Sequence, residues 1–223
     1  MRADTGYSTI NFYDQGFRVK NLTSTIEHEK AYRLRHRIFV DELKWVAPQA
    51  DRLEIDVYDG KGMFPLGVFN QTGELIAHLR ITLPHHSFMM EREFASLIES
   101  PISKSCSTVE VSRVCIEYGW RRVKLKTVYG EYHLSMLLYK GLYQWCCQNL
   151  INNMYMVIEY KLYRLLKMTG FSCEAIGRTI IMPDGVSAIA VKIDWRKFES
   201  VNKKQKPQLL TWFDDSRVMN QAA

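Results

Sequence analysis

The chain lacks the long apolar segments that hold a protein in a membrane or direct it across one. No apolar run reaches the roughly 18 residues of a membrane-spanning helix. The first residues, MRADTGYSTINF, have no apolar core of the kind a signal peptide needs. The 5 cysteines are odd in number and show no C-x-x-C spacing, which indicates free thiols in a reducing compartment. We therefore expect a soluble, cytoplasmic protein without a membrane span.

Several motifs of common enzyme classes are also missing. No Gly-rich loop follows a strand at phosphate-binding spacing, and no G-x-S-x-G elbow is present for a serine nucleophile. The 6 histidines form no HExxH or other metal-ligand pattern, and no cysteine lies in a catalytic context. We expect no metal site and no tightly bound cofactor.

Positive charge is concentrated in the second half of the chain. Residues 1–100 hold 12 Lys and Arg against 14 Asp and Glu, a net −2, whereas residues 101–223 hold 18 against 10, a net +8. This favours an acidic partner: nucleic acid, a phosphate-bearing cofactor or an acidic carrier protein. The basic residues are scattered, and neither zinc-finger spacing nor a helix-turn-helix pattern is present, so we expect no nucleic-acid binding.

The order of predicted elements indicates an α/β fold. Ser24 and Glu27 form a capping box that opens a helix through about Asp41, and a long polar loop follows it. The remaining predicted elements are a hairpin (63–70 and 74–83), a short helix (88–98), a strand (107–116), a helix (130–150), a strand (153–159), a helix (160–170) closed by Gly170, and two strands (171–177 and 186–195). This order predicts one mixed sheet covered by helices.

We expect a single domain over residues 1–223. Its core spans about residues 24–197, and the tail from about residue 198 to 223 is expected to be a peripheral helix or partly disordered.

The strand STVEVSRVCI, residues 107–116, contains two charges that a plain strand would not accommodate together. Glu110 and Arg113 are three residues apart, so on a regular strand they face opposite sides and one of them enters the core. A β-bulge between them would bring both charges to one side, and bulges are frequent beside active sites. The alternative is a buried Glu–Arg pair with no catalytic role.

Polar and aromatic residues elsewhere complete a pattern. Singly, each has an ordinary explanation as a surface charge, loop anchor or solvated turn. Together they resemble, in order and nearly in spacing, the signature of the acyl-homoserine-lactone synthases, the autoinducer synthases of bacterial quorum sensing. The matching positions are Arg35, Phe39, Trp45, Asp56, Asp59, Arg80, Phe94, Glu110 and Arg113. The resemblance covers roughly residues 30–195 and rests on four local sequences: YRLRHRIFVDELKW, EIDVYD, AHLRIT and VEVSRV.

The resemblance implies an acetyltransferase-like (GNAT) three-layer α/β/α sandwich with a mixed central sheet. It also implies an N-acyltransferase that moves a fatty acyl group from acyl-carrier protein or acyl-CoA to the amine of S-adenosylmethionine, with lactonisation afterwards. The segment VIEYKLYRLLKMTGF resembles the related long-chain N-acyl amino acid synthases, whose acceptor is a free amino acid such as tyrosine. A residue other than the family's usual aromatic, Val114, follows the Ser-Arg pair. A third alternative is a catalytically silent binding module of the same fold.

Acyl transfer to an amine requires a base, and Glu110 is the candidate. Burial among valines would raise its pKa, while Arg113 would oppose that shift. By resemblance, Asp59 joins these two in catalysis. Arg35, Phe39, Trp45 and Asp56, together with Arg80 and Phe94, shape the substrate pocket. Carboxylates and aromatic rings suit an acceptor with an amine and a sulfonium.

The donor side is less defined by the sequence. The segments YHLSMLLYKGLYQW (132–145) and NMYMVI (153–158) can line an acyl slot, or simply form the core. The basic residues of RRVKLK are candidates for docking the acidic helix of a carrier protein or the phosphates of coenzyme A; they are Arg121, Arg122, Lys124 and Lys126.

Overall fold

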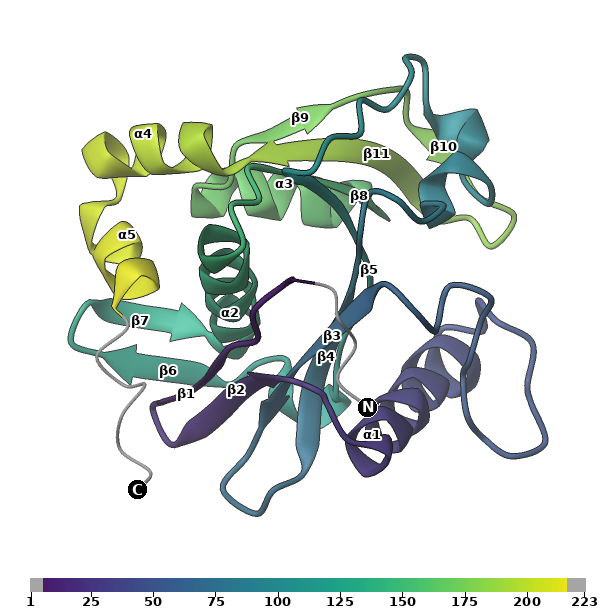
Figure 1. Ribbon diagram of the computed structural model, residues 1–223, viewed down its shortest axis with the longest axis horizontal. Helices are drawn as coiled ribbons and strands as arrows, with labels where there is room; N and C mark the ends of the chain where they lie inside the picture. Colours follow the sequence, from purple (N-terminus) through teal and green to yellow (C-terminus); the bar gives the residue numbers. More distant parts are fainter. Residues whose placement is uncertain (1–5, 216–223) are drawn as a thin grey trace.

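A nine-stranded sheet runs through the molecule in the computed structural model, which describes residues 6–215 (Figure 1). Its strands are β1 (Asn11–Asp14), β2 (Phe17–Asn21), β3 (Met63–Phe69), β4 (Leu75–Thr82), β5 (Thr108–Ile116), β8 (Asn153–Glu159), β9 (Cys173–Ala175), β10 (Ile180–Ile181) and β11 (Ser187–Asp194). The order across the sheet is β1-β2-β3-β4-β5-β8-β11-β10, and β9 also pairs with β11. All of these pairs are antiparallel except β5 with β8, so the sheet is mixed, as predicted.

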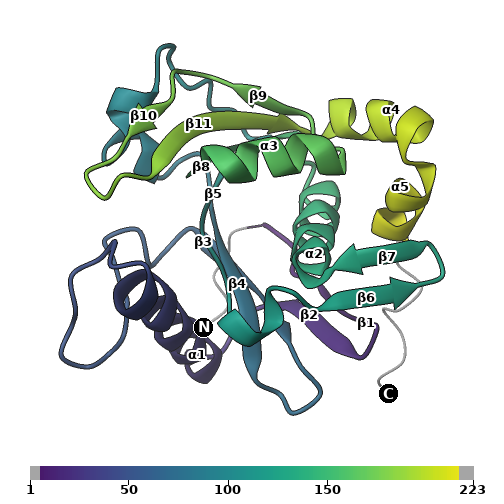
Figure 2. The same cartoon turned by 180° about the vertical axis from the view of Figure 1, so that it is seen from behind.

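Helices cover both faces of this sheet. The longer helices are α1 (Thr25–Arg35), α2 (Leu134–Gln148), α3 (Tyr160–Thr169), α4 (Trp195–Gln205) and α5 (Pro207–Asp214). The short turns are η1 (His36–Glu42), η2 (Met89–Glu91), η3 (Ala95–Leu97) and η4 (Tyr118–Trp120), and a separate hairpin is formed by β6 (Lys124–Thr127) and β7 (Gly130–His133). Helix α1 lies across the sheet from α2, as the two opposite views show (Figures 1 and 2). The predicted three-layer α/β/α sandwich is confirmed.

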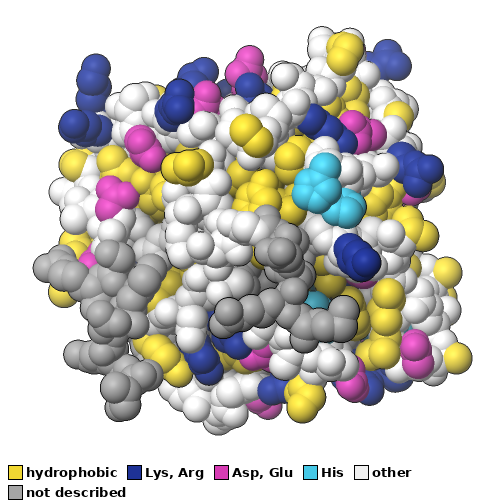
Figure 3. Space-filling model, viewed as in Figure 1, with side chains coloured by type: hydrophobic (Ala, Val, Ile, Leu, Met, Phe, Trp, Pro, Cys, Tyr) yellow, Lys and Arg dark blue, Asp and Glu magenta, His cyan; other side chains and the backbone are white. Residues whose placement is uncertain are grey.

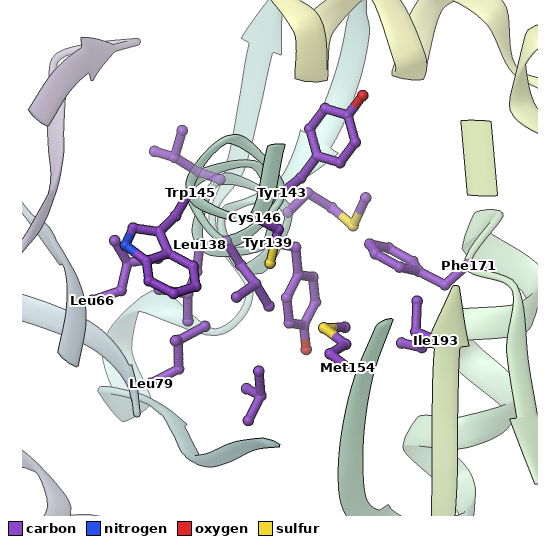
Figure 4. Close-up of a cluster of buried hydrophobic side chains, with 14 of the residues drawn as sticks. Leu66, Leu79, Leu138, Tyr139, Tyr143, Trp145, Cys146, Met154, Phe171 and Ile193 are labelled. Carbon is purple, nitrogen blue, oxygen red and sulfur yellow. The ribbon is translucent and has the colours of Figure 1, made fainter. Parts of the chain in front are cut away.

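The main core lies between the sheet and α2. Helix α2 is buried along most of its length because its apolar residues pack on β3, β4, β8 and β11. Figure 4 shows Trp145 and Leu138 of α2 beside Leu66 and Leu79, with Tyr139 beside Met154. A smaller cluster under α1, which includes Leu34 and Cys115, fills the opposite face.

Local signals in the sequence account for several boundaries. Ser24 Oγ accepts from the Glu27 N–H, and Glu27 Oε2 accepts from the Ser24 N–H, so the predicted capping box starts α1. Gly170, at φ 105°, ends α3 as predicted because this left-handed conformation favours glycine. No helix among residues 6–215 is long and apolar enough to cross a bilayer.

The structure differs from the sequence-based elements at both ends. Strands β1 and β2 precede the predicted core boundary at about residue 24, and Phe12 and Val19 are buried in the core. The expectation of a peripheral tail is wrong for α4 and α5, because Phe198 and Phe213 are fully buried. The rest of the predicted tail, residues 216–223, lies outside the described residues.

Two internal elements also differ. The predicted short helix over residues 88–98 is two separate 3₁₀ turns, η2 and η3. The predicted helix over residues 130–150 begins later, at Leu134, because residues 130–133 form β7 against β6.

Candidate active site

Strand β5 contains the predicted β-bulge. Its neighbour β4 pairs His78 with Cys115 and Arg80 with Ser112, so β4 advances two residues while β5 advances three. The extra residue is accommodated where Arg113 adopts φ 53°, a left-handed conformation that is uncommon for a residue other than glycine. Backbone strain is therefore located at one of the two charged residues of the strand.

The bulge places both charges of β5 on the same side. The Met89 N–H donates to Glu110 Oε2 at 2.7 Å, and Arg113 Nη1 lies 3.2 Å from Met89 Sδ. On the opposite side, Val111 and Val114 both pack with the main core. In a regular strand, two residues three apart would face opposite sides of the sheet. The bulge thus resolves the conflict between the charges and the core.

A cavity opens where β5 and β8 separate. Parallel pairing joins the two strands only from Thr108↔Asn153 to Glu110↔Tyr155, although β5 continues to Ile116. The cavity between the diverging strands has a volume of about 530 Å³. Its lining residues come from η1 and the loop after it, from η2 and η3, from β5 and β8, and from the start of α3 and the turn before β11.

Two stacked aromatic rings form one wall of this cavity. The rings of Phe39 and Trp45 lie 6.1 Å apart at an angle of 27°. Phe39 belongs to the π-helical turn η1, and its carbonyl accepts from the N–H groups of Trp45 at 2.8 Å and Val46 at 3.2 Å. The backbone therefore fixes both rings. The guanidinium of Arg113 lies 5.5 Å from the centre of the Phe39 ring.

A buried ionic network supports the floor of the site. Arg35 Nη1 and Nη2 donate to the two oxygens of Asp59, both at 2.8 Å, and Arg35 Nε donates to Glu54. Arg35 and Glu54 are each 1 % exposed. Two buried carboxylates thus neutralise one buried guanidinium with directed hydrogen bonds.

Two further arginines extend the network to the sheet. Arg80 Nη1 donates to Asp59 at 3.0 Å and also to Asp56, and Arg80 Nε donates to Ser112 at 3.0 Å. Arg113 Nη2 lies 2.9 Å from Glu54 Oε1 and 2.7 Å from Asp56 Oδ2.

These contacts join three arginines to three carboxylates, so the network is electrically balanced. Burial alone would raise the pKa of Asp59, but hydrogen bonds and charge from Arg35, together with the charge of Arg80, hold it well below its usual range. Asp59 therefore remains ionised within the network.

Glu110 has the electrostatic environment expected of a base. Its side chain is buried, and burial raises its pKa to about 7, despite the N–H groups of Met90 and Met89 that donate to its carboxylate. The guanidinium that opposes the shift is that of Arg80, where the sequence pointed to Arg113. A carboxyl group with this pKa exchanges its proton near neutral pH.

The nine predicted site residues are brought together in two layers. Those that line the cavity are Phe39, Trp45, Phe94, Glu110 and Arg113. Those in the network behind it are Arg35, Asp56, Asp59 and Arg80.

Glu54 was missing from the predicted set although it accepts hydrogen bonds from both Arg35 and Arg113. It lies within the EIDVYD cluster, so a signal for it was present. Met89, which contacts both charges of β5, carried no signal in the sequence.

Only one of the two segments considered for the acyl slot lines this cavity. Met156, Val157 and Ile158 of β8 line the cavity, whereas residues 132–145 contribute no lining residue and pack in the main core instead. Leu162, Met182 and other apolar side chains complete the wall.

Two of the four candidate docking residues have acidic partners. Arg121 Nη2 donates to Glu42 at 2.7 Å, and Lys124 Nζ donates to Glu131 at 2.7 Å. Arg122 and Lys126 are exposed and form no salt bridge in the described part of the chain. In residues 6–215, no group of three or more His, Cys, Asp and Glu side chains is arranged to hold a metal ion.

A family model described as autoinducer synthase matches residues 19–202. The chain belongs to the autoinducer synthase family. Among its relatives, the acyl-homoserine-lactone synthase of Pantoea stewartii subsp. stewartii is 25% identical over 154 residues, covering 68% of this chain and 70% of the relative. That of Rhizobium radiobacter is 24% identical over 185 residues, covering 78% and 85%. The family expected from the sequence is confirmed, and as a member the chain is an acyltransferase.

Solved structures of autoinducer synthases share the fold. The acyl-homoserine-lactone synthase LasI superposes with a TM-score of 0.70 at 18% identity, covering 89% of this chain and 96% of LasI. The CoA-dependent acyl-homoserine lactone synthase BjaI, solved with MTA, superposes with a TM-score of 0.67 at 19% identity, covering 79% and 80%. An acyl-CoA N-acyltransferase from Pseudomonas aeruginosa gives a TM-score of 0.54 at 19% identity over 79% of this chain.

Proposed function

We propose that this autoinducer synthase transfers a fatty acyl group from a thioester to the amine of S-adenosylmethionine and then forms an acyl-homoserine lactone. The observation that carries the proposal is the cavity between β5 and β8. It combines a carboxyl group of raised pKa, Glu110, with a cation, Arg113, an aromatic pair and a long apolar wall. These are the groups that an amine, a carboxylate, a sulfonium and an acyl chain require.

The acceptor binds on the aromatic side of the cavity. The stacked rings of Phe39 and Trp45 provide the π surface that attracts a sulfonium. Arg113 retains partial exposure, so its guanidinium is available to the acceptor carboxylate. The CoA-dependent synthase BjaI has been solved with MTA and also with SAM and isopentyl-CoA, which is consistent with this acceptor.

Glu110 removes the proton that prevents the ammonium from attacking. The free amine then adds to the thioester carbonyl carbon, and the oxyanion accepts hydrogen bonds from backbone N–H groups of β5 that have no partner on β8 beyond Glu110. Collapse of the tetrahedral intermediate breaks the C–S bond and releases the thiol, which carries away a proton. In the second step the acceptor carboxylate attacks the carbon next to the sulfonium, closes the lactone ring and expels methylthioadenosine.

The acyl chain lies along β8. Met156, Ile158 and Leu162, together with Met182 and Ala188, form an apolar surface suited to methylene groups. Acyl-carrier protein and acyl-CoA both remain candidate donors, since either one presents the same thioester.

A carrier protein has two basic surfaces available. The predicted surface at residues 121–126 keeps two cations, Arg122 and Lys126, that form no salt bridge within residues 6–215. Helix α3 is the alternative, because it contains Lys161, Arg164 and Lys167 and no acidic residue. It also adjoins the cavity through Leu162, so we propose α3 as the principal docking surface.

The second candidate function is acylation of a free amino acid. Arg113 and Glu110 recognise a carboxylate and an amine without requiring a sulfonium. The segment that resembles the N-acyl amino acid synthases also reaches the cavity, through Glu159 and Leu162. Among the side chains of the cavity, the aromatic pair is the feature that favours S-adenosylmethionine.

The acceptor is tested by offering purified protein an acyl thioester with S-adenosylmethionine, or with each amino acid, and following thiol release. Thiol release with S-adenosylmethionine and an equal amount of methylthioadenosine supports the first function. Thiol release only with an amino acid such as tyrosine, without methylthioadenosine, contradicts it and supports the second. A Trp45→Ala variant should weaken use of S-adenosylmethionine more than use of any amino acid.

A further inference from the structure

A second, smaller cavity of about 280 Å³ lies on the other side of the ionic network. It shares no lining residue with the cavity between β5 and β8. Its walls are the loop before β3, the end of β4 and the segment that leads into and follows η2. The lining residues are Val57, Tyr58, Asp59, Gly60, Lys61, Thr82, His86, Ser87 and Arg92.

The unneutralised charges at this cavity are positive. Lys61 and Arg92 form no salt bridge within residues 6–215. The carboxylate of Asp59 accepts from Arg35 and Arg80, so its charge is already balanced. The space-filling view shows Lys and Arg side chains, interspersed with Asp and Glu, around an exposed group of histidines on one face of the molecule (Figure 3).

The nearby acids are also engaged elsewhere. Glu91 pairs with Lys104, and Glu93 accepts from the Tyr58 hydroxyl at 3.0 Å. A dianion entering the cavity therefore meets two free cations and no free carboxylate on its walls.

A buried hydroxyl at the cavity has no hydrogen-bond partner. Thr82 is 3 % exposed, and its Oγ1 makes no hydrogen bond among the described residues. An unsatisfied buried polar group is unfavourable, and a ligand oxygen in the cavity would satisfy it. The hydroxyl of Ser87 and the single ring N–H of neutral His86 add further donors on the same walls.

We propose that this cavity binds the phosphate group of a small phosphorylated molecule. A phosphate has enough acceptor oxygens to bind the Arg92 guanidinium, the Lys61 ammonium and the Thr82 hydroxyl together, whereas a carboxylate has only two oxygens. The volume exceeds that of a bare phosphate, so an organic part fits beside the ring of Tyr58.

Occupancy of this site acts on the catalytic residue. Thr82 is the direct cross-strand partner of Glu110. The turn that carries Arg92 also supplies the Met89 and Met90 N–H groups that hold the Glu110 carboxylate. A ligand that draws Thr82 and Arg92 together therefore changes the position of Glu110. This consequence for turnover rests on the proposed function, but the binding itself does not.

The binding test uses calorimetric titration of the full chain with glycerol 3-phosphate and, separately, with inorganic phosphate. We expect saturable binding, weakened about tenfold or more in the double variant Lys61→Gln/Arg92→Gln, which removes two charge-assisted contacts. Thr82→Val should weaken binding. It should not lower the thermal unfolding temperature, because the Thr82 hydroxyl has no hydrogen-bond partner in the free protein. The matched control is Lys203→Gln/Lys204→Gln on α4, which removes the same charge from exposed positions that line neither cavity.

Absence of saturable binding, or equal weakening in the control, overturns the proposal. If binding is saturable, steady-state kinetics of acyl transfer in the presence of glycerol 3-phosphate identify the source of the phosphate. A changed kcat at constant KM for acyl-CoA indicates a separate effector, and a raised KM for acyl-CoA indicates that the site holds the donor's own phosphate. Because binding is measured without turnover, failure of the acyltransferase assay leaves this test intact.

Discussion

At the scale of single residues, Glu54 connects two parts of the ionic network. It accepts from Arg35 on α1 and from Arg113 on β5, and it is 1 % exposed. It joins α1, which leads directly into the turn η1 that carries Phe39, to the bulge that carries Arg113. Losing its charge leaves two buried guanidinium groups short of an anion.

We therefore predict that Glu54→Gln lowers the free energy of unfolding by about 3–5 kcal/mol, the cost of breaking a buried ion pair. Urea denaturation measures it. The control is Glu29→Gln, which removes the same charge from the half-exposed pair with Arg33 and should cost about 0–1 kcal/mol. Equal effects of the two substitutions would show that the network does not stabilise the fold.

Eight of the nine residues predicted for the site lie in recognisable local sequences, such as EIDVYD and VEVSRV, whereas Phe94 was matched by order and spacing alone. Their division into a cavity layer and a buried layer was not predictable, since it depends on which side of the sheet α1 packs. The same limit applies to the charge facing Glu110. Arg113 is close in sequence, but Arg80 on the neighbouring strand is the guanidinium that opposes its pKa shift.

At the scale of elements, a break in the alternation of apolar and polar residues along β5 predicted its β-bulge. Two charges among valines at a spacing of three contradict a regular strand, and a bulge removes the contradiction. The N-terminal hairpin was missed although Gln15 and Gly16, both at positive φ, form its turn between β1 and β2. Its strands are only 4 and 5 residues long, too short for a strong alternation signal. The π-helical winding of η1 has no sequence rule that predicts it.

Helix α3 carries the element-scale prediction. Reversing Lys161 and Arg164 to Glu should raise KM for acyl-carrier protein and reduce the salt dependence of the rate, because an acidic carrier loses its attraction to the cavity rim. Steady-state kinetics at several salt concentrations measure both effects. Reversing Arg122 and Lys126 should raise KM less, and reversing Lys203 and Lys204 should leave it unchanged. A larger effect at Arg122 and Lys126 would move the docking surface to residues 121–126.

At the scale of the whole molecule, the strand β1 is joined to the helices α2 and α5. Lys140 of α2 lies 2.6 Å from Asp14 of β1, and the Trp212 indole N–H of α5 donates to the same carboxylate at 2.8 Å. All three side chains are buried. This contact explains why the C-terminal helices are part of the core. The polar sequence after residue 197 did not indicate that result.

We predict that Lys140→Met lowers the free energy of unfolding by about 3–5 kcal/mol, because it leaves the Asp14 carboxylate buried without a cation. Chemical denaturation measures the change. The double variant Asp14→Asn/Lys140→Met should recover a large part of it, since the amide oxygen still accepts from Trp212 without burying a charge. A double variant no more stable than Lys140→Met alone would contradict this interpretation.

The most direct test of the central claim, that Glu110 is the base of acyl transfer, is the pH dependence of kcat/KM with S-adenosylmethionine. Because the base acts when ionised, the rate should rise with pH and level off above the Glu110 pKa of about 7. Glu110→Gln should remain folded, lose activity by roughly 10²–10⁴-fold and lose this rising limb. A folded Glu110→Gln variant with near-normal turnover, or with an unchanged pH profile, would contradict the claim.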